Sequence, residues 1–146
     1  MRDLPGKLTA DELAELFEGR TRLVEQLALL EDPLGRARDV IGELSEEEKL
    51  EALNAHPAIG QRAGLSARSA REQGADDDPE VLEELARLNR AYEERFGFRF
   101  VVFVDRRPKR EIVLVLRDRL ERTREDELDT AVGELVAIAR DRYRRG

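Results

Sequence analysis

The sequence predicts a single, mostly helical domain, and two observations support this prediction. Apolar side chains recur at intervals of three and four residues along most of the chain, which is the periodicity of an α-helix that buries one face. Several of these apolar runs begin at residues that cap helix N-termini, such as Thr9 and Ser45, each followed three residues later by glutamate. A chain of 146 residues has the size of one domain, which we expect to span residues 1–146.

Two helices are expected in the first thirty residues. The spacing from Thr9 to Glu12 fits a capping box, so the first helix begins after Thr9 and ends near Gly19. A second apolar run, from Leu23 to Leu30, continues at helical intervals.

The next two helices are predicted from their caps. Asp32 fits an N-cap and Pro33 the first helical position, which indicates a helix that reaches Leu44. Ser45 begins another capping box. Because a proline disfavours the helical conformation of the residue before it, this fourth helix should stop at His56.

A loop and two more helices follow. Residues 57–65 contain two glycines and are typical of a loop, and Ser66 then fits the N-cap of a helix that Gly74 closes. The most strongly amphipathic helix begins at Pro79, after three aspartates, and ends before Gly97. Its apolar stripe consists of Val81, Leu82, Leu85, Leu88, Tyr92 and Phe96.

The pattern after Gly97 has two interpretations. Residues 98–104 favour a strand, and residues 112–116 could pair with them as a hairpin across residues 106–109. The apolar residues from 112 to 120 also fit one face of a helix, and the local pattern leaves both interpretations open. The last segment predicts a long helix with a stripe formed by Leu128, Ala131, Val132, Leu135, Ile138, Ala139 and Arg142.

Composition excludes several classes of function. The 33 acidic residues outnumber the 26 basic ones, giving a net charge of -7, so we expect no nucleic-acid partner. Zero cysteines exclude disulfides and thiolate sites, and a single histidine excludes a multi-histidine centre, so no metal is expected. No apolar run approaches the roughly 20 residues of a membrane helix, and the N-terminal sequence lacks a signal-peptide core. We therefore expect a cytoplasmic protein without a membrane partner.

Candidate chemistry gathers around the one histidine. His56 lies at a predicted helix C-terminus, where the helix dipole favours the imidazolium form. Ser69, Glu72 and Gln73 are three and four residues apart, so they lie on one face of a helix and could line a pocket. Taken alone, His56 could equally be an ordinary surface or helix-cap histidine without a catalytic role. The other three residues also fit a capping box or a solvated face.

Four short motifs together resemble a known family. They are HPAIG at 56–60, SAREQ at 69–73, LNRAYEERFGF at 88–98 and IARDRY at 138–143. In this order they resemble the 2-oxo-4-hydroxy-4-carboxy-5-ureidoimidazoline (OHCU) decarboxylases of urate breakdown, and the resemblance covers about the last two thirds of the chain. The chain departs from the family pattern at residues 19–22, which lack the usual Ser-Pro-Trp, and at Arg99, where proline is usual.

The resemblance implies an all-α fold, a single-domain helical bundle with a short extended segment near residues 98–104 and a helix over residues 112–120. It also implies a homodimer that decarboxylates OHCU, a small-molecule ureidoimidazoline substrate, to (S)-allantoin without a cofactor. By motif, the implied catalytic residues are His56 and Glu72. The implied substrate-binding residues are Pro57, Ser69, Gln73, Phe100, Val101, Val102, Phe103, Val104 and Arg142. The departures leave open a drifted substrate or a non-catalytic interaction role.

Overall fold

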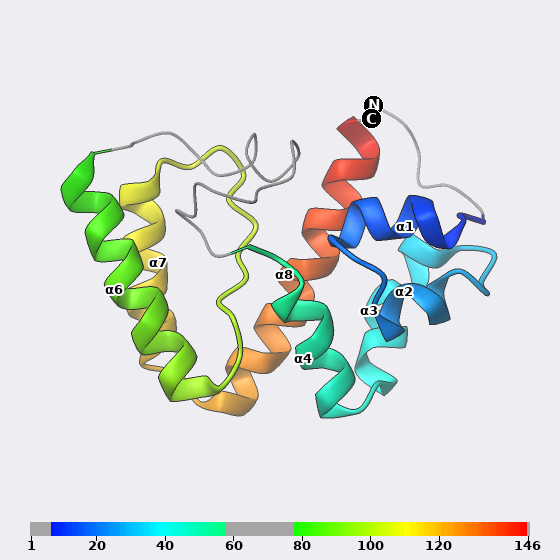
Figure 1. Cartoon of the computed structure of the whole chain (residues 1–146), viewed down its shortest axis with the longest axis horizontal. Helices are drawn as coiled ribbons and strands as arrows, with labels where there is room; N and C mark the ends of the chain where they lie inside the picture. Colours follow the sequence, from blue (N-terminus) through cyan, green and yellow to red (C-terminus); the bar gives the residue numbers. More distant parts are fainter. Residues whose placement is uncertain (1–6, 58–77, 146) are drawn as a thin grey trace. The chain divides into compact units, whose positions relative to one another are not determined.

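The structure is a computed structural model that describes residues 7–57 and 78–145. Within these ranges the chain forms seven helices and no strand, which confirms the predicted all-α class (Figure 1). None of the helices in the described ranges is long and apolar enough to cross a membrane. The helix predicted from Ser66 to Gly74 lies outside the described residues and stays a prediction.

The chain divides into two compact units. Unit 1 comprises residues 1–56 and 132–146, and unit 2 comprises residues 57–131. The last helix, α8 (Arg124–Arg145), begins in unit 2 and ends in unit 1. That the chain behaves as one domain stays a prediction.

Unit 1 is built around a short central helix. Its N-terminal helices are α1 (Ala10–Phe17), α2 (Arg22–Leu27), α3 (Pro33–Glu43) and α4 (Glu46–Asn54). Helix α2 packs against α1, α3 and α4, and its three apolar side chains are fully buried. The core also includes side chains from the C-terminal part of α8, namely Val132, Leu135, Val136 and Ala139.

Three helix starts of unit 1, those of α1, α3 and α4, are those that the sequence predicts. The hydroxyl of Thr9 accepts a hydrogen bond from the Glu12 N–H at 3.1 Å, and Glu12 in turn accepts from the Thr9 N–H. Ser45 forms the same reciprocal box at the start of α4. Asp32 caps α3, with Pro33 at the first helical position. These bonds satisfy N–H groups that have no partner within their own helix.

Two helix ends differ from the prediction. Helix α2 ends at Leu27 instead of continuing to Leu30, because the N–H groups of Leu29 and Leu30 bond three residues back, which tightens and ends the helix. Leu29 is 77% exposed, so the apolar run does not continue one buried face. Helix α4 ends at Asn54, two residues before the predicted stop at His56.

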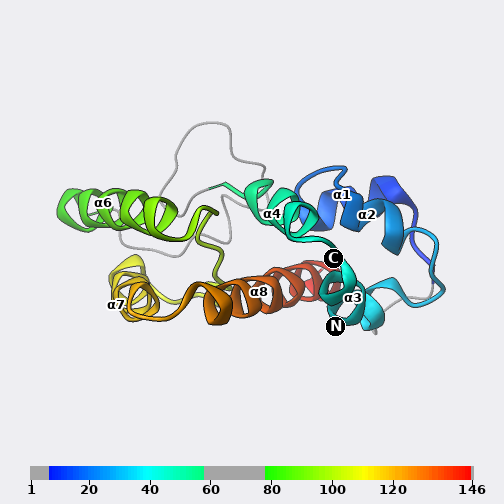
Figure 2. The ribbon, with the colours of Figure 1, turned by 90° about the horizontal axis from the view of Figure 1, so that it is seen from below.

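Unit 2 holds two long helices, α6 (Pro79–Phe96) and α7 (Lys109–Leu120), which pack side by side (Figure 1, Figure 2). Asp78 caps the start of α6, and Gly97 ends it in the left-handed conformation with φ 79°. Residues 112–120 are helical, so the hairpin interpretation is wrong and the helix implied by the family resemblance is confirmed. Pro108, directly before α7, occupies the N-cap position of this helix.

An aromatic cluster fills unit 2 where α6 meets the segment that follows it. The ring of Tyr92 lies 4.7 Å from that of Phe96, 5.8 Å from that of Phe98 and 5.2 Å from that of Phe100, measured between centroids. These distances are typical of favourable tilted and edge-to-face aromatic pairs. The segment from residue 98 to 104 contains neither helix nor ladder pairing and is mostly buried. Burial of its apolar side chains explains its strand-like composition without a sheet.

Candidate active site

His56 lies in the turn that follows α4. Its backbone N–H donates to the carbonyl of Leu53 at 3.2 Å, and the residue is only 5% exposed. Pro57 comes next and is half-buried. The boundary between the two units falls between His56 and Pro57. The one histidine of the chain therefore follows a helix C-terminus, as its position before proline predicts, and its burial is a finding of the structure.

Arg142 is held by the C-terminal end of α1. It lies near the end of α8 and is 2% exposed. Its Nη1 donates to the carbonyls of Leu16 at 3.2 Å and Glu15 at 3.4 Å, and its Nη2 lies 3.0 Å from Oε1 of Glu18. The last carbonyls of a helix have no partner within the helix, and they carry the negative end of its dipole. Because α1 has no basic residue in its last turn, Arg142 supplies this positive charge.

The contacts of Arg142 on α1 add a structural role that the family motif did not indicate. They join residues more than 120 positions apart, so no local sequence pattern predicts these contacts. His56 and Arg142 both belong to unit 1, whereas Pro57 and residues 100–104 belong to unit 2. Three further predicted site residues lie outside the described ranges and stay predictions: Ser69, Glu72 and Gln73.

Arginine side chains bind the backbone carbonyls of the segment between α6 and α7. Four of the predicted substrate-binding residues there are buried, and Phe103 is half-buried. Arg119 donates from Nη1 to the carbonyl of Val101 at 2.9 Å. Arg107 donates to the carbonyls of Phe103 at 2.7 Å and Val104 at 3.0 Å. Each of these bonds is charge-assisted and therefore stronger than a neutral one.

The segment ends in a tight turn. Asp105 and Arg106 both adopt the left-handed conformation, with φ 48° and 65°. Two consecutive non-glycine residues in this region are costly, and they persist only where the surrounding structure holds them. The N–H of Arg107 bonds back to the carbonyl of Val104 at 3.1 Å, which closes the turn before α7 begins.

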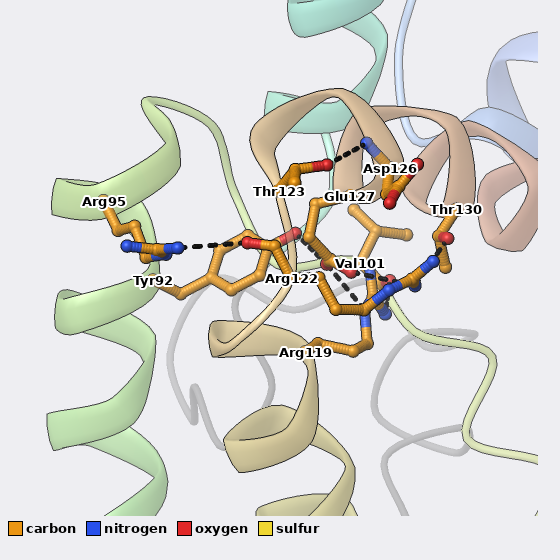
Figure 3. Close-up of polar contacts among 9 residues, drawn as sticks. All are labelled: Tyr92, Arg95, Val101, Arg119, Arg122, Thr123, Asp126, Glu127 and Thr130. Carbon is orange, nitrogen blue, oxygen red and sulfur yellow. Dashed lines mark hydrogen bonds and ion pairs between the residues drawn. The ribbon is translucent and has the colours of Figure 1, made fainter.

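A buried polar cluster, which we call the Glu127 cluster, lies beside this segment. It comprises Glu127, Arg119, Tyr92 and Arg122 (Figure 3). Glu127 is fully buried, and its Oε1 accepts from the hydroxyl of Tyr92 at 2.6 Å and from Nε of Arg119 at 2.7 Å. Its Oε2 accepts from Nη1 of Arg122 at 3.1 Å. Two guanidinium groups and a phenol thus compensate one buried carboxylate.

The environment of the Glu127 cluster changes the acidity of the tyrosine. Burial raises the pKa of the Tyr92 phenol well above its ordinary value of 10.0, and the hydrogen bond to the Glu127 carboxylate raises it further. Arg119 opposes the shift through its positive charge but does not reverse it. Tyr92 therefore stays protonated and acts as a hydrogen-bond donor.

The Glu127 cluster is a feature that the sequence reasoning missed, although the pattern held a signal for it. Glu127 lies four residues before Ala131 and eight before Leu135, so it continues the buried stripe of α8. Arg119 lies three residues after Leu116 on the buried face of α7. The register of these two residues is compatible with a buried ion pair, because charged side chains are rarely buried unless they are paired.

Comparisons with known proteins agree on one family. The family model described as OHCU decarboxylase matches residues 4–144. The uric acid degradation bifunctional protein PucL of Bacillus subtilis is 33% identical over 143 residues, which cover 90% of this chain and 29% of the relative. The 2-oxo-4-hydroxy-4-carboxy-5-ureidoimidazoline decarboxylase of Halalkalicoccus jeotgali is 32% identical over 105 residues, which cover 69% of this chain and 60% of the relative. This chain thus spans less than two thirds of either relative.

The fold comparison leads to the same family. The crystal structure of OHCU decarboxylase in the presence of (S)-allantoin superposes with a TM-score of 0.74 at 25% identity, covering 90% of this chain and 94% of the other. Because the family model spans nearly the whole chain, this protein belongs to the OHCU decarboxylase family.

Proposed function

We propose that this protein decarboxylates OHCU to (S)-allantoin without a cofactor. The observation that carries the proposal is the family match over residues 4–144, a range that includes all four motifs and every proposed site residue. The structural neighbour determined in the presence of (S)-allantoin supports the same product.

The reaction breaks one carbon–carbon bond. The carboxylate of the substrate leaves as carbon dioxide, and the electron pair of the broken bond stays on the ring, where the imine and carbonyl groups absorb it. The carbon that carried the carboxylate forms a double bond to the neighbouring ureido-bearing carbon, and the imine nitrogen takes up the displaced electron pair and a proton. The hydroxyl group then loses its proton and becomes the carbonyl of the product, while a proton adds to one face of the ureido-bearing carbon, and the choice of face sets the configuration of the product. Such a step requires oriented hydrogen-bond donors in a site closed to water, and one acid-base group for the proton.

His56 supplies the acid-base group in this proposal. Its imidazole engages the substrate hydroxyl or delivers the proton, and Glu72 orients the imidazole or the substrate. The burial of His56 and its fixed place after α4 support this assignment, because a proton-transfer group must be held within hydrogen-bond reach of its target. Pro57 contacts the substrate next to it, and Ser69 and Gln73 donate hydrogen bonds.

Two further groups bind the substrate. Backbone groups of the segment formed by Phe100, Val101, Val102, Phe103 and Val104 contact the ring, and Arg142 holds a carboxylate or carbonyl through its guanidinium. The contacts of Arg142 with Leu16 and Glu18 support this role, since a guanidinium that the fold already orients loses less entropy when it binds.

The product's configuration tests the function. Purified protein is coupled to enzymatic urate oxidation, and the chirality of the allantoin is followed by circular dichroism. We expect an excess of the (S) form, because uncatalysed decay of OHCU gives a racemate. A racemic product at every protein concentration would refute the proposal, and would favour a drifted substrate or a non-catalytic role.

Replacement of the histidine tests the mechanism. We expect His56→Asn to abolish turnover and to keep the helical circular-dichroism spectrum, because asparagine keeps a polar group there and cannot transfer the proton. Glu47→Gln, on the exposed face of α4, is the matched control and should retain the wild-type rate. If the folded His56→Asn variant turns over freshly generated OHCU at near the wild-type rate, His56 is not the acid-base group.

The homodimer and the cytoplasmic location are part of the proposal. The dimer is carried over from the family resemblance, and sedimentation of the purified protein would test it. The absence of cysteine is compatible with the reducing cytoplasm, and fractionation of cells that express the protein would test the location.

A further inference from the structure

We infer that Arg119, held by Glu127, is a positioning residue that fixes residues 100–104 in the geometry that contacts substrate. The inference rests on the proposed function, in which this segment binds the substrate. It concerns two side chains that lie outside the four family motifs and that local sequence pattern did not single out.

The segment is anchored at three places by arginine. Arg124 donates to the carbonyl of Phe96 at 2.8 Å, before the segment begins, and Arg107 holds the carbonyls at its far end. Arg119 reaches its middle, at Val101. Without this central bond, the remaining arginine hydrogen bonds would lie before the segment and at its far end, and the backbone at Val101 would be held by side-chain packing alone.

Arg119 also fixes the side chain at the start of the segment. Its guanidinium carbon lies 4.6 Å from the ring centroid of Phe100 and 5.9 Å from that of Tyr92. At these distances a guanidinium is attracted to the ring faces, and the attraction is stronger when the group is desolvated, as it is here at 4% exposure. One side chain therefore holds the carbonyl of Val101 and the ring of Phe100 together.

Glu127 orients Arg119. The Nε donates to Glu127, while Nη1 points to Val101, so the two bonds use different edges of the planar guanidinium (Figure 3). Lysine has a single ammonium on a flexible stem and cannot reproduce this geometry or stack on the ring. Arg119→Lys therefore keeps the charge that compensates Glu127 and loses the hold on the segment.

The experiment compares the steady-state kinetics of three variants, well below their unfolding temperatures. We expect Arg119→Lys to raise KM for OHCU about tenfold, the effect of losing one charge-assisted hydrogen bond, and to leave kcat within about twofold of wild type. Hydrogen exchange of the amides of residues 100–104 should become faster in the same variant. A purely structural role would lower the unfolding temperature and leave KM unchanged.

Two controls separate positioning from general loss of stability. Tyr92→Phe removes a hydrogen bond from the same cluster but keeps the bonds of Arg119, so it should be less stable than wild type with an unchanged KM. Arg117→Lys alters an exposed arginine of α7 that pairs with Glu84 and should change neither quantity. If Tyr92→Phe raises KM as much as Arg119→Lys does, the inference is wrong.

The outcomes distinguish this inference from the proposed function. An active wild type together with a folded Arg119→Lys variant of wild-type KM overturns the inference alone. A wild type that yields only racemic allantoin overturns the proposed function and this inference with it. If Arg119→Lys does not fold, Glu127→Gln replaces it, because it keeps the shape and removes the charge that orients Arg119. A wild-type KM in that folded variant would also overturn the inference.

Discussion

At the scale of single residues, two buried charges among the described residues, Glu127 and Arg142, are each compensated by a particular set of partners. Glu127 is fully buried with two arginines and a tyrosine around it, and Arg142 is buried against carbonyls and a carboxylate. Removing a charged group from water costs several kcal/mol, and these partners stabilise the fold chiefly by offsetting that cost. A single substitution at one of these sites therefore lowers stability mainly because it leaves the remaining polar groups buried without that hydrogen-bond partner.

The Tyr92 phenol predicts a pH dependence of stability. Its pKa is raised in the folded state by burial and by Glu127, so the folded state holds this proton more tightly than the unfolded state does. The contribution is fully present below about pH 10 and is lost as the pH rises through the folded pKa. We expect the free energy of unfolding of Tyr92→Phe to fall less steeply above about pH 10 than that of wild type, measured by urea unfolding.

The other tyrosine of the chain provides the control for this titration. Tyr143→Phe should retain the steep alkaline loss of wild type, since Tyr92 is still present. Equal alkaline slopes for wild type and Tyr92→Phe would show that Tyr92 does not contribute to the pH dependence.

Replacement of Arg142 should lower the stability of the fold independently of any effect on catalysis. Arg142→Met keeps much of the side-chain volume but leaves the terminal carbonyls of α1 and the Glu18 carboxylate without this donor. We expect a decrease in the free energy of unfolding of about 1–3 kcal/mol, the cost of a lost buried hydrogen-bond partner. Arg144→Met, at an exposed position two residues later, should stay within about 0.5 kcal/mol of wild type. A fully stable Arg142→Met variant would contradict the structural role.

The residues of the candidate site differ in how far sequence could predict them. The place of His56 just after a helix follows from a local rule, because the proline after it disfavours the helical conformation, whereas its burial depends on packing that no local pattern shows. The partners of Arg142 lie on α1 at the opposite end of the chain, and such a long-range contact leaves no periodic signal. Arg119 and Glu127 do continue buried stripes, but a charged residue in a stripe is usually interpreted as its solvated edge.

At the scale of elements, the starts of α1, α3, α4 and α6 were predictable from sequence, and some helix ends were not. The starts of α1 and α4 each depend on one cap residue and the N–H three positions after it, at Thr9 and Ser45. The end of α2 depends on where the chain stops burying side chains: Leu27 is buried, whereas Leu29 is exposed. Residues 112–116 fitted both a strand and a helix because a short apolar run satisfies either period. In the structure these residues are helical and belong to α7, which packs against α6.

Replacement of glycine by alanine is expected to have opposite effects on stability at Gly97 and at Gly42. Gly97 ends α6 with φ 79°, and an added Cβ would meet no atom within 4 Å, so the cost of Gly97→Ala is conformational. We expect a loss of about 1 kcal/mol in the free energy of unfolding. Gly42 lies within α3, also with no atom within 4 Å of an added Cβ, and Gly42→Ala should stabilise by about 0.5–1 kcal/mol. Changes of the same sign in both variants would contradict this assignment.

At the scale of the whole molecule, α8 belongs to both compact units. Its first residues carry Glu127 into the buried cluster of unit 2, and its later residues carry Leu135 and Arg142 into the core of unit 1. If one unit unfolded alone, its part of α8 would lose the packing that stabilises it. Isolated helical segments of this length are marginal in water, so partial unfolding of α8 would also weaken the unit that remains folded.

We therefore expect thermal unfolding to be a single cooperative transition. The chain has two tyrosines, Tyr92 in unit 2 and Tyr143 in unit 1, and no tryptophan. Tyr143→Phe leaves a tyrosine signal from unit 2 alone, and Tyr92→Phe leaves one from unit 1 alone. In each variant the tyrosine transition should coincide with the loss of helical circular dichroism, because the shared helix links the two units. A tyrosine transition separated from the helical one in either variant would show that the units unfold independently and that the chain is not one cooperative domain.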